Sequence, residues 1–383
     1  MSSAVGWLRL VDSFRLGPNA ATRTRKTRST SRRARLQSTT SFGSVVLAAY
    51  SPDPALFARQ LTSIRDQTHR EFECVIVADG DPLGVSRLVE QILGADTRFR
   101  VVGFEDRVGF YRNFERGLRM IDPASTWVAL SDQDDYWQPT KLEVLLPLLA
   151  DHTLVSCQAR LVSHPSGEVV AENTRRRTSS PEEIVIDNQF TGSFMVFRPD
   201  VLMTALPFPI VRSRAEVHDH WIAVCSAALG DAFILDEVLQ DYMQHDRNVL
   251  GESRLRSQRF HPTRLLRALV AESRRYEGSA GVRSLVRYRY RQVLGWECAM
   301  VTMLANRAPD NEVADRLSEI FGRRRRWTKT IGFLSRATRS RRIPIGTTLL
   351  FLQGWVLERL ATVPRRGEVP DDADRVRRAN RAA

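Results

Sequence analysis

The chain has 383 residues, enough for about two domains, and 43% of them are hydrophobic, as in globular proteins. A formal net charge of +13 predicts basic tails or an anionic partner, such as nucleic acid, acidic lipid or a phosphorylated substrate. The four cysteines lie far apart without a CxxC pair, which argues against a thiolate zinc site and favours a reducing compartment. No apolar run of about 18 residues and no cleavable signal segment is evident, so we expect a cytoplasmic protein.

The first segment, residues 1–42, is rich in Arg, Ser and Thr, and Asp12 is its only acidic residue. It has no sustained apolar periodicity. This composition predicts a basic, disordered N-terminal arm.

From Ser44 the chain alternates short β-rich apolar runs with stretches of helical periodicity. Such alternation predicts an α/β fold with a doubly wound, mostly parallel sheet flanked by helices. The expected strands are 44–50, 73–79, 99–104 and 126–130, and the expected helices are 54–64, 84–93, 110–120 and 139–150.

After residue 150 the alternation loosens. We expect strands at 153–160, 189–197 and 232–242 and a helix at 217–229. From Gly251 onward the pattern is helical and rich in Arg. The predicted organisation is therefore an arm (1–42), a catalytic domain (43–250) and an Arg-rich helical C-terminal region (251–383).

Three carboxylates follow the expected strand 126–130, in the sequence ALSDQDDYWQP. Asp132, Asp134 and Asp135 repel one another unless water, a cation or backbone N–H groups neutralise them. A solvated turn is the simple alternative. Because Asp79 closes another strand, and ligands of such sheets bind beyond the carboxyl ends of the strands, a shared site is the better interpretation.

Closely spaced carboxylates offer hard oxygen ligands, which favour Mn²⁺ or Mg²⁺, and substrate phosphates often complete the coordination of such ions. A nucleotide diphosphate is therefore an economical partner for this cluster. A DxD motif alone is weak evidence, since it occurs by chance in many proteins.

Several motifs in order from about Ser44 to Gly251 resemble family 2 glycosyltransferases of the GT-A fold, particularly the rhamnosyltransferase-like branch. The most specific is LSDQDDYWQPTKL, and the next is QLTSIRDQT. The others are SVVLAAYSPD, ECVIVADGD, RVGFYRNFERGL, FTGSFMVFRPDVL and HDHWIAV with YMQHDRN.

The resemblance implies a role for each matching residue. Asp219 corresponds to the catalytic carboxylate, and Asp132 and Asp134 to the DxD that holds the sugar phosphate and the metal, with Asp135 beside them. His245 corresponds to a histidine that approaches the metal or phosphate. The nucleotide-sugar pocket would be lined by Ala49, Tyr50, Asp79, Arg107, Asn113 and Asp132.

This chain departs from the family pattern near the first two strands. Many relatives have paired acids where it has Ala78 and Asp79, and an asparagine where it has Ser51. The nucleotide contacts are therefore less well supported than the metal site.

The implied reaction is an inverting displacement in which Asp219 removes the proton of the acceptor hydroxyl. The substrates would be a nucleotide-sugar donor, with dTDP-rhamnose as the favoured guess, and a cell-envelope glycan or lipid-linked acceptor. A helix N-cap or a first-turn acid is the simple alternative for Asp219. His218 and His220 flank it, but side chains two residues apart on a helix do not share a face, so packing roles are favoured.

Two other functions are consistent with parts of the sequence. A phosphohydrolase or nucleotidyltransferase could use the same DxD. The high net charge also fits a nucleic-acid-binding protein, although the excess Arg lies outside the central domain, whose acidic residues would repel a nucleic-acid backbone. We expect no nucleic-acid partner.

A basic stretch precedes a final apolar segment at 343–363. This order suits a basic surface on anionic lipid, with an amphipathic helix in the interface, at the cytoplasmic face of a membrane. A packed helical cap with solvated arginines is the alternative. The basic residues are Arg323 to Arg326, Lys329, Arg336, Arg339, Arg341 and Arg342.

Overall fold

A computed structural model describes residues 41–244 and 262–361. The predicted N-terminal arm lies outside the described residues except for its last two positions. His245, predicted to approach the metal or phosphate, also lies outside them.

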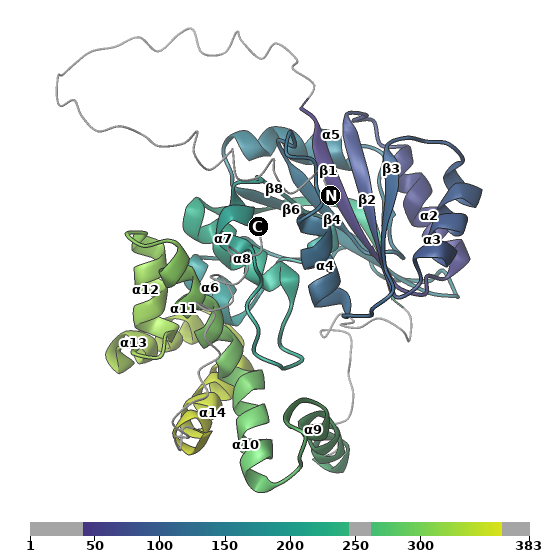
Figure 1. Cartoon of the computed structure of the whole chain (residues 1–383). Helices are drawn as coiled ribbons and strands as arrows, with labels where there is room; N and C mark the ends of the chain where they lie inside the picture. Colours follow the sequence, from purple (N-terminus) through teal and green to yellow (C-terminus); the bar gives the residue numbers. More distant parts are fainter. Residues whose placement is uncertain (1–40, 245–261, 362–383) are drawn as a thin grey trace, which may run out of the picture. The chain divides into compact units, whose positions relative to one another are not determined.

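The described strands form one nine-stranded sheet (Figure 1). Its order is β3-β2-β1-β4-β8-β6-β9-β5, and β7 pairs with β6 at the side. The strands are β1 (Gly43–Ala49), β2 (Phe72–Asp79), β3 (Phe99–Phe104), β4 (Val128–Ser131), β5 (Tyr136–Trp137), β6 (Leu154–Ser163), β7 (Val169–Ala171), β8 (Met195–Phe197) and β9 (Ala232–Gln244).

The first half of the sheet is parallel, because β1 pairs in parallel with both β2 and β4, and β2 with β3. Beyond β4 the sheet is mixed: β8 runs antiparallel to β4 and β6, whereas β9 runs parallel to β6. The predicted α/β class is confirmed. Helices separate the parallel strands, as such crossovers require.

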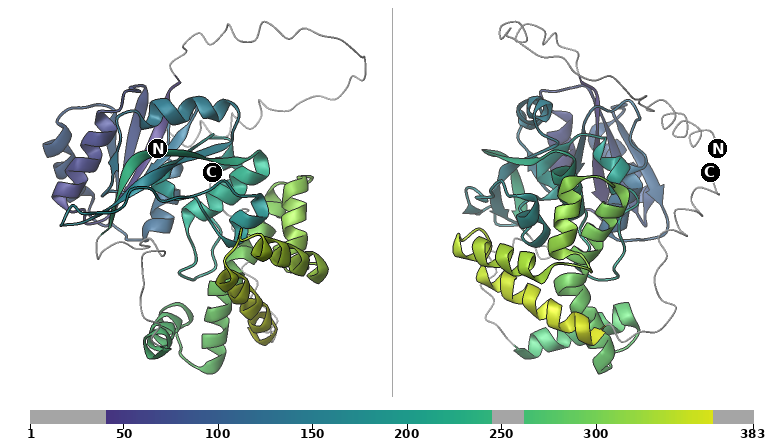
Figure 2. Two further views of the ribbon diagram at one scale, coloured as in Figure 1. Left: turned by 180° about the vertical axis from the view of Figure 1, so that it is seen from behind. Right: turned by 90° about the vertical axis from the view of Figure 1, so that its left-hand side faces the viewer.

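The helices of the α/β part lie on both faces of the sheet (Figure 2). They are α2 (Pro54–Arg65), α3 (Pro82–Leu93), α4 (Phe110–Leu118), α5 (Lys141–Leu145), α6 (Pro181–Ile186), α7 (Val201–Ala205) and α8 (His218–Leu229). The C-terminal helices are α9 (Pro262–Glu277), α10 (Val282–Tyr290), α11 (Trp296–Arg307), α12 (Glu312–Phe321), α13 (Trp327–Arg339) and α14 (Ile345–Ala361), with a π-helical segment at Arg291–Gly295.

Alternate residues of the central strands supply two hydrophobic cores, one on each face of the sheet. Val45 of β1 packs with Phe57 and Leu61 of α2. The next residue, Val46, belongs instead to the other core, which contains Phe114 of α4 and residues of α7, α8 and α11 to α13. The C-terminal helices therefore share a core with the face of the sheet that α4 and α8 cover.

Two predicted elements are shorter than expected. The helix predicted at 139–150 ends as an α-helix at Leu145 and continues as a 3₁₀-helix, Leu146–Ala150, in which Pro147 cannot donate a helical hydrogen bond. The strand predicted at 189–197 comprises only β8, because Gly192–Phe194 forms a 3₁₀ turn. The backbone N–H of Gly192 in that turn donates to Asp219 rather than to the sheet.

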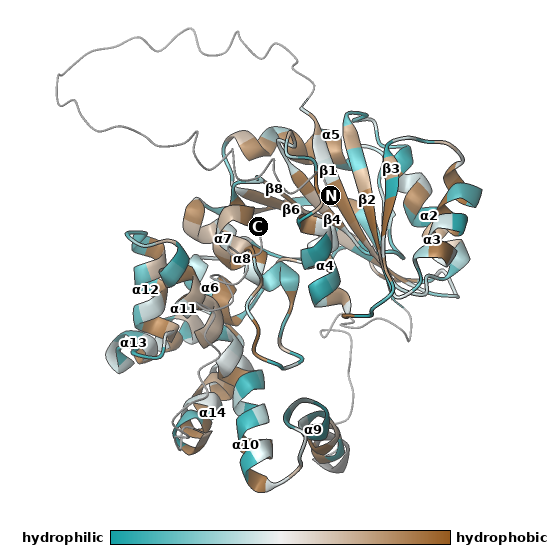
Figure 3. Cartoon of the chain, in the orientation of Figure 1, coloured by the Kyte–Doolittle hydropathy of each residue, from teal (hydrophilic) through white to brown (hydrophobic). Residues whose placement is uncertain are grey.

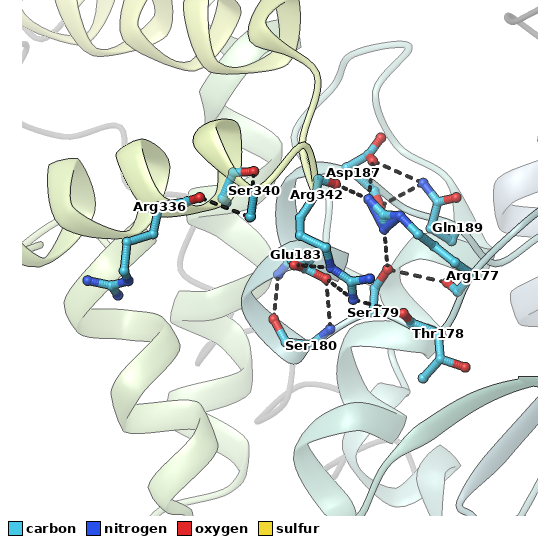
Figure 4. Close-up of polar contacts among 11 residues, drawn as sticks. Arg177, Thr178, Ser179, Ser180, Glu183, Asp187, Gln189, Arg336, Ser340 and Arg342 are labelled. Carbon is cyan, nitrogen blue, oxygen red and sulfur yellow. Dashed lines mark hydrogen bonds and ion pairs between the residues drawn. The ribbon is translucent and has the colours of Figure 1, made fainter.

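An ionic contact fastens the C-terminal helices to the α/β part (Figure 4). The guanidinium of Arg342 donates to both carboxylate oxygens of Glu183, each at 2.9 Å, and to the carbonyl of Thr178. The guanidinium of Arg177 donates a hydrogen bond to the backbone carbonyl of Arg342. In the same view the side chain of Arg336 points away from this cluster.

Within the described ranges, no helix is both long enough and apolar enough to cross a membrane.

Candidate active site

Carboxylates that are distant in sequence meet beyond the carboxyl end of β4. Asp132, Asp134 and Asp135 follow this strand directly, and Asp219 lies in the first turn of α8. Asp219 is close enough that its charge raises the pKa of Asp132. The sequence predicted a site shared by these acids and Asp79, whereas the acid from a distant segment that acts on Asp132 is Asp219.

Asp135 is the innermost of the three acids, and it is completely buried. One carboxylate oxygen accepts hydrogen bonds from the Ser193 hydroxyl (2.9 Å) and the Gln240 amide (3.2 Å), and the other accepts one from the Met243 backbone N–H (3.1 Å). Burial, followed by the charges of Asp134 and Asp132, raises its pKa well above the usual range. Both oxygens accept hydrogen bonds from the protein itself, so we assign Asp135 a structural role in the site.

Lys141 is a buried cation beneath the acids, and sequence reasoning did not single it out. Its ammonium donates to the carbonyl of Ser193 and to Oε1 of Gln240, both at 2.6 Å, and lies 3.8 Å from the ring centroid of Trp137. Burial lowers the pKa of Lys141 to about 8, although the charges of nearby acids, Asp135 among them, act in the opposite direction. The single ammonium group of Lys141 thus contacts three segments of the site, those that contain Ser193, Gln240 and Trp137.

Asp132 lies at the rim of this cluster and is only partly buried. Desolvation, then the charges of Asp134 and Asp219, raises the pKa of Asp132 to about 7. The charges of Asp134 and Asp219 disfavour the ionised form of Asp132, and a bound cation would stabilise that form. The site therefore has the charge that a metal–diphosphate ligand would neutralise.

Asp219 is held by the segment that precedes β8. Its carboxylate accepts hydrogen bonds from the Asn188 amide (3.3 Å) and the Gly192 backbone N–H (3.2 Å). The N-cap of α8 is Val217, so Asp219 is not the N-cap residue, but it is an acid of the first helical turn, as the simple alternative allows. Desolvation raises the pKa of Asp219 to about 6, close to the value that suits a general base at neutral pH.

The two histidines beside Asp219 are packed in the core. His220 contacts the carbonyl of Ile184 at 2.8 Å, and its Nδ1 accepts a hydrogen bond from the Trp296 indole at 3.2 Å. His218 stacks on Phe114 with ring centroids 3.9 Å apart. Burial lowers the pKa of His218 to about 3 and that of His220 to about 4, so both are neutral at physiological pH.

Trp137 and Trp221 are also fully buried, which excludes them as exposed platforms for a sugar.

The end of β1 is joined to the acidic turn by Gln133. Its side-chain amide accepts from the Tyr50 backbone N–H at 2.7 Å and donates to the Tyr50 carbonyl at 3.2 Å. The Tyr50 ring is 44% exposed, and the guanidinium of Arg107 stands 3.7 Å from its centroid. Ala49, by contrast, is buried. Tyr50 and Arg107 thus present a flat, exposed surface near the acids.

Asp79 and Asn113 organise the segment that carries Arg107. The two carboxylate oxygens of Asp79 accept hydrogen bonds from the backbone N–H groups of Val108 and Gly109, both at 2.8 Å, just before α4 begins. The Asn113 amide donates to the carbonyl of Val77 at 2.8 Å. Both side chains are buried and orient the loop, and neither is exposed as Tyr50 is.

Comparison with known proteins identifies the class of this domain. Residues 44–204 match the model of a family described as "Glycosyl transferase family 2". This segment is similar to that family, and the mixed sheet with flanking helices and a helical C-terminal region has the GT-A architecture that the resemblance implied.

Individual relatives are distant. The putative glycosyltransferase EpsH of Bacillus subtilis is 25% identical over 47% of this chain and 54% of its own length. The putative teichuronic acid biosynthesis glycosyltransferase TuaG of the same organism is 23% identical over 47% of this chain and 70% of its own. The crystal structure of S. aureus TarS 1-349 in complex with UDP-GlcNAc has a TM-score of 0.44 and 14% identity, covering 82% of this chain and 79% of that one.

This chain spans 14%, 54% and 65% of the lengths of three curated relatives that it matches.

Proposed function

We propose that the chain is an inverting glycosyltransferase that transfers a sugar from a nucleotide-diphosphate donor. The observation that carries the proposal is the meeting of Asp132 and Asp219, which come from separate segments, and whose pKa values are both raised. Pairs of carboxylates in such environments are typical of sites that handle charge and protons.

In the proposed reaction, Asp219 accepts the proton of the acceptor hydroxyl as that oxygen attacks the anomeric carbon. A single carboxylate on the acceptor side is what an inverting displacement requires. The hydrogen bonds from Asn188 and Gly192 would hold the Asp219 carboxylate in place for this step.

Asp132 and Asp134 are the residues proposed to hold Mn²⁺ or Mg²⁺. No group of three or more His, Cys, Asp or Glu side chains forms a complete metal site in the described parts of the chain. Two carboxylates at the rim nevertheless fit a hard divalent ion whose remaining ligands are water and phosphate oxygens. When bound, the ion would neutralise charge on the leaving diphosphate.

We propose that Tyr50 and Arg107 contact the nucleotide base directly. Ala49, Asp79 and Asn113 would shape that pocket from behind, since they are buried. dTDP-rhamnose remains the favoured donor, on the rhamnosyltransferase-like motifs alone. We propose a cell-envelope glycan or a lipid-linked acceptor, reached at the cytoplasmic face of a membrane by a peripheral enzyme, with the domain boundaries predicted above.

The first test is a thermal-shift screen of nucleotide sugars with and without Mn²⁺, because a ligand that binds only the folded state raises the melting temperature. A stabilising nucleotide sugar should lose its effect in Asp132→Asn and keep it in Asp219→Asn. Asp151→Asn, an exposed carboxylate away from the site, is the matched control. Stabilisation by no nucleotide sugar would contradict the proposal, and free sugar or phosphate as the product would favour the phosphohydrolase alternative.

A further inference from the structure

Helix α14 leaves an apolar stripe uncovered. One side of the helix packs on the π-helical segment, where Gly354 fits so closely that an added Cβ would lie 2.5 Å from the Cβ of Leu294. The opposite side carries large apolar side chains that are each between 59% and 68% exposed. We call these four residues the α14 stripe: Ile345, Leu349, Val356 and Leu360.

The stripe is continuous along the helix. At about 100° per residue, its four positions fall within an arc of about 60°. Over 17 residues, α14 extends about 25 Å. Figure 3 shows the concentration of hydrophobic residues on α14. A helical face of this kind normally packs against another surface.

Positive charges stand at both ends of the stripe. Arg339 is the last residue of α13, Arg341 lies in the segment between α13 and α14, and Arg359 lies in the last turn of α14. All three are exposed, and none forms an ion pair with a described carboxylate. Four other basic residues of this region form ion pairs with glutamates: Arg325, Arg326, Lys329 and Arg342. Three more are exposed and form no ion pair with a described residue: Arg323, Arg324 and Arg336.

We infer that the α14 stripe docks on an anionic lipid bilayer, with α14 lying in the interface and the flanking arginines on lipid phosphates. A helix with one apolar face and a basic border is the form that binds an interface without spanning it. The inference deepens the proposed function and rests on it, because it supplies the surface on which a lipid-linked acceptor would be met.

Charge favours lipid over a second copy of the chain. Pairing two stripes would bring the arginines of one copy near those of the other, and like charges disfavour such contacts. Anionic headgroups would instead neutralise the same arginines, at a free-energy gain that accumulates with each basic group near the surface.

The test is flotation of the full-length protein with vesicles of phosphatidylcholine containing about 30% phosphatidylglycerol, compared with pure phosphatidylcholine. We expect binding to the anionic vesicles at low salt that weakens at high salt. Leu349→Ser with Val356→Ser should weaken it about tenfold or more through lost apolar burial. Arg339→Gln with Arg341→Gln should weaken it about thirty-fold.

Matched controls come from exposed residues of the α/β part. Leu83→Ser with Met203→Ser replaces two apolar side chains that are at least as exposed as those of the stripe, and Arg87→Gln removes an exposed charge. Neither control should change flotation. Unchanged binding by the stripe variants, or failure of the wild type to float at low salt, would overturn the inference. So would a dimer in light scattering that the stripe variants dissociate while vesicle binding is absent.

Flotation measures binding without transfer, so its failure is distinguishable from failure of the proposed glycosyltransferase activity.

Discussion

Two groups of charged side chains differ most in burial: the fully buried Asp135 and Lys141 near the carboxyl ends of the strands, and the exposed arginines beside α14. Asp135 and Lys141 are fully buried, and each is held by several hydrogen bonds. Arg339 and Arg341 are exposed and have no ion-pair partner among the described residues. Buried charge is expensive unless it is partnered, whereas an exposed charge is solvated and contributes little to stability.

The difference suits the two functions proposed above. Desolvated acids have shifted pKa values and strong interactions with ions, as chemistry on a diphosphate requires. Exposed arginines act together and at longer range, as binding to an extended anionic surface requires. Although the net charge of the chain is +13, the molecule therefore contains a local acidic site.

The largest expected effect is at the acidic rim. We expect Asp134→Ala and Asp132→Ala each to reduce transfer by about 10³-fold or more, since the charge that balances a metal–diphosphate ligand is lost. Initial rates with Mn²⁺, and Mn²⁺-dependent nucleotide binding, are the measurements. Asp151→Asn should be as active as the wild type, and circular dichroism should show all three variants folded. Full Mn²⁺-dependent activity in both alanine variants would refute the DxD assignment.

Asp219→Asn separates binding from chemistry at the same site. Because the amide keeps the shape of the carboxylate but cannot accept the proton, we expect turnover to fall about 10²-fold or more. The donor should still bind, so the dissociation constant measured by calorimetry should change little. An unchanged turnover number would leave Asp219 with only a structural role.

A third experiment compares a buried cation with an exposed one. Lys141→Met leaves the Ser193 carbonyl and Gln240 Oε1 without their donor, and we expect a loss of about 3 kcal/mol in the free energy of unfolding. Lys329→Met removes an exposed ion pair with Glu319 and should change the free energy of unfolding much less than Lys141→Met does. Denaturant titrations of both variants give the comparison. Equal effects would show that burial of the charge is not what distinguishes the two regions.

Most of the α/β fold could be predicted from the sequence. Strands buried on both faces appear as continuous apolar runs, and helices such as α2 begin at a proline after an Asp cap, which are local signals. The 3₁₀ turn at Gly192–Phe194 could not be predicted in the same way. Its conformation is linked to Asp219, which comes 27 residues later.

A short motif in the sequence singles out Asp132 and Asp134, and their role as metal ligands stays a prediction. Lys141 was missed because its burial depends on Gln240, 99 residues away, and no local pattern distinguishes it from an exposed lysine. Asp79 and Asn113 were predicted to line the nucleotide pocket. Their hydrogen bonds to Val108, Gly109 and Val77 depend on how α4 meets β2, which periodicity does not encode.

The smallest expected effect is the pH dependence of stability contributed by Asp219. Desolvation raises its pKa from about 4 in the unfolded chain to about 6, so between these values the folded state binds more protons than the unfolded state. The free energy of unfolding should therefore decrease as pH rises through this window. Since Asp219 is partly exposed, we expect a contribution of about 1 kcal/mol.

Melting curves of the wild type and Asp219→Asn from pH 4 to pH 8, with a chelator present, measure this contribution. The variant lacks the titrating group, so its stability relative to the wild type should increase with pH and level off above about pH 7. Asp151→Asn, whose carboxylate is exposed, should follow the wild type throughout. A stability difference between Asp219→Asn and the wild type that stays constant with pH would mean that Asp219 has the same pKa in the folded and unfolded chains. Desolvation would then not distinguish this carboxylate from the exposed charges of the C-terminal helices.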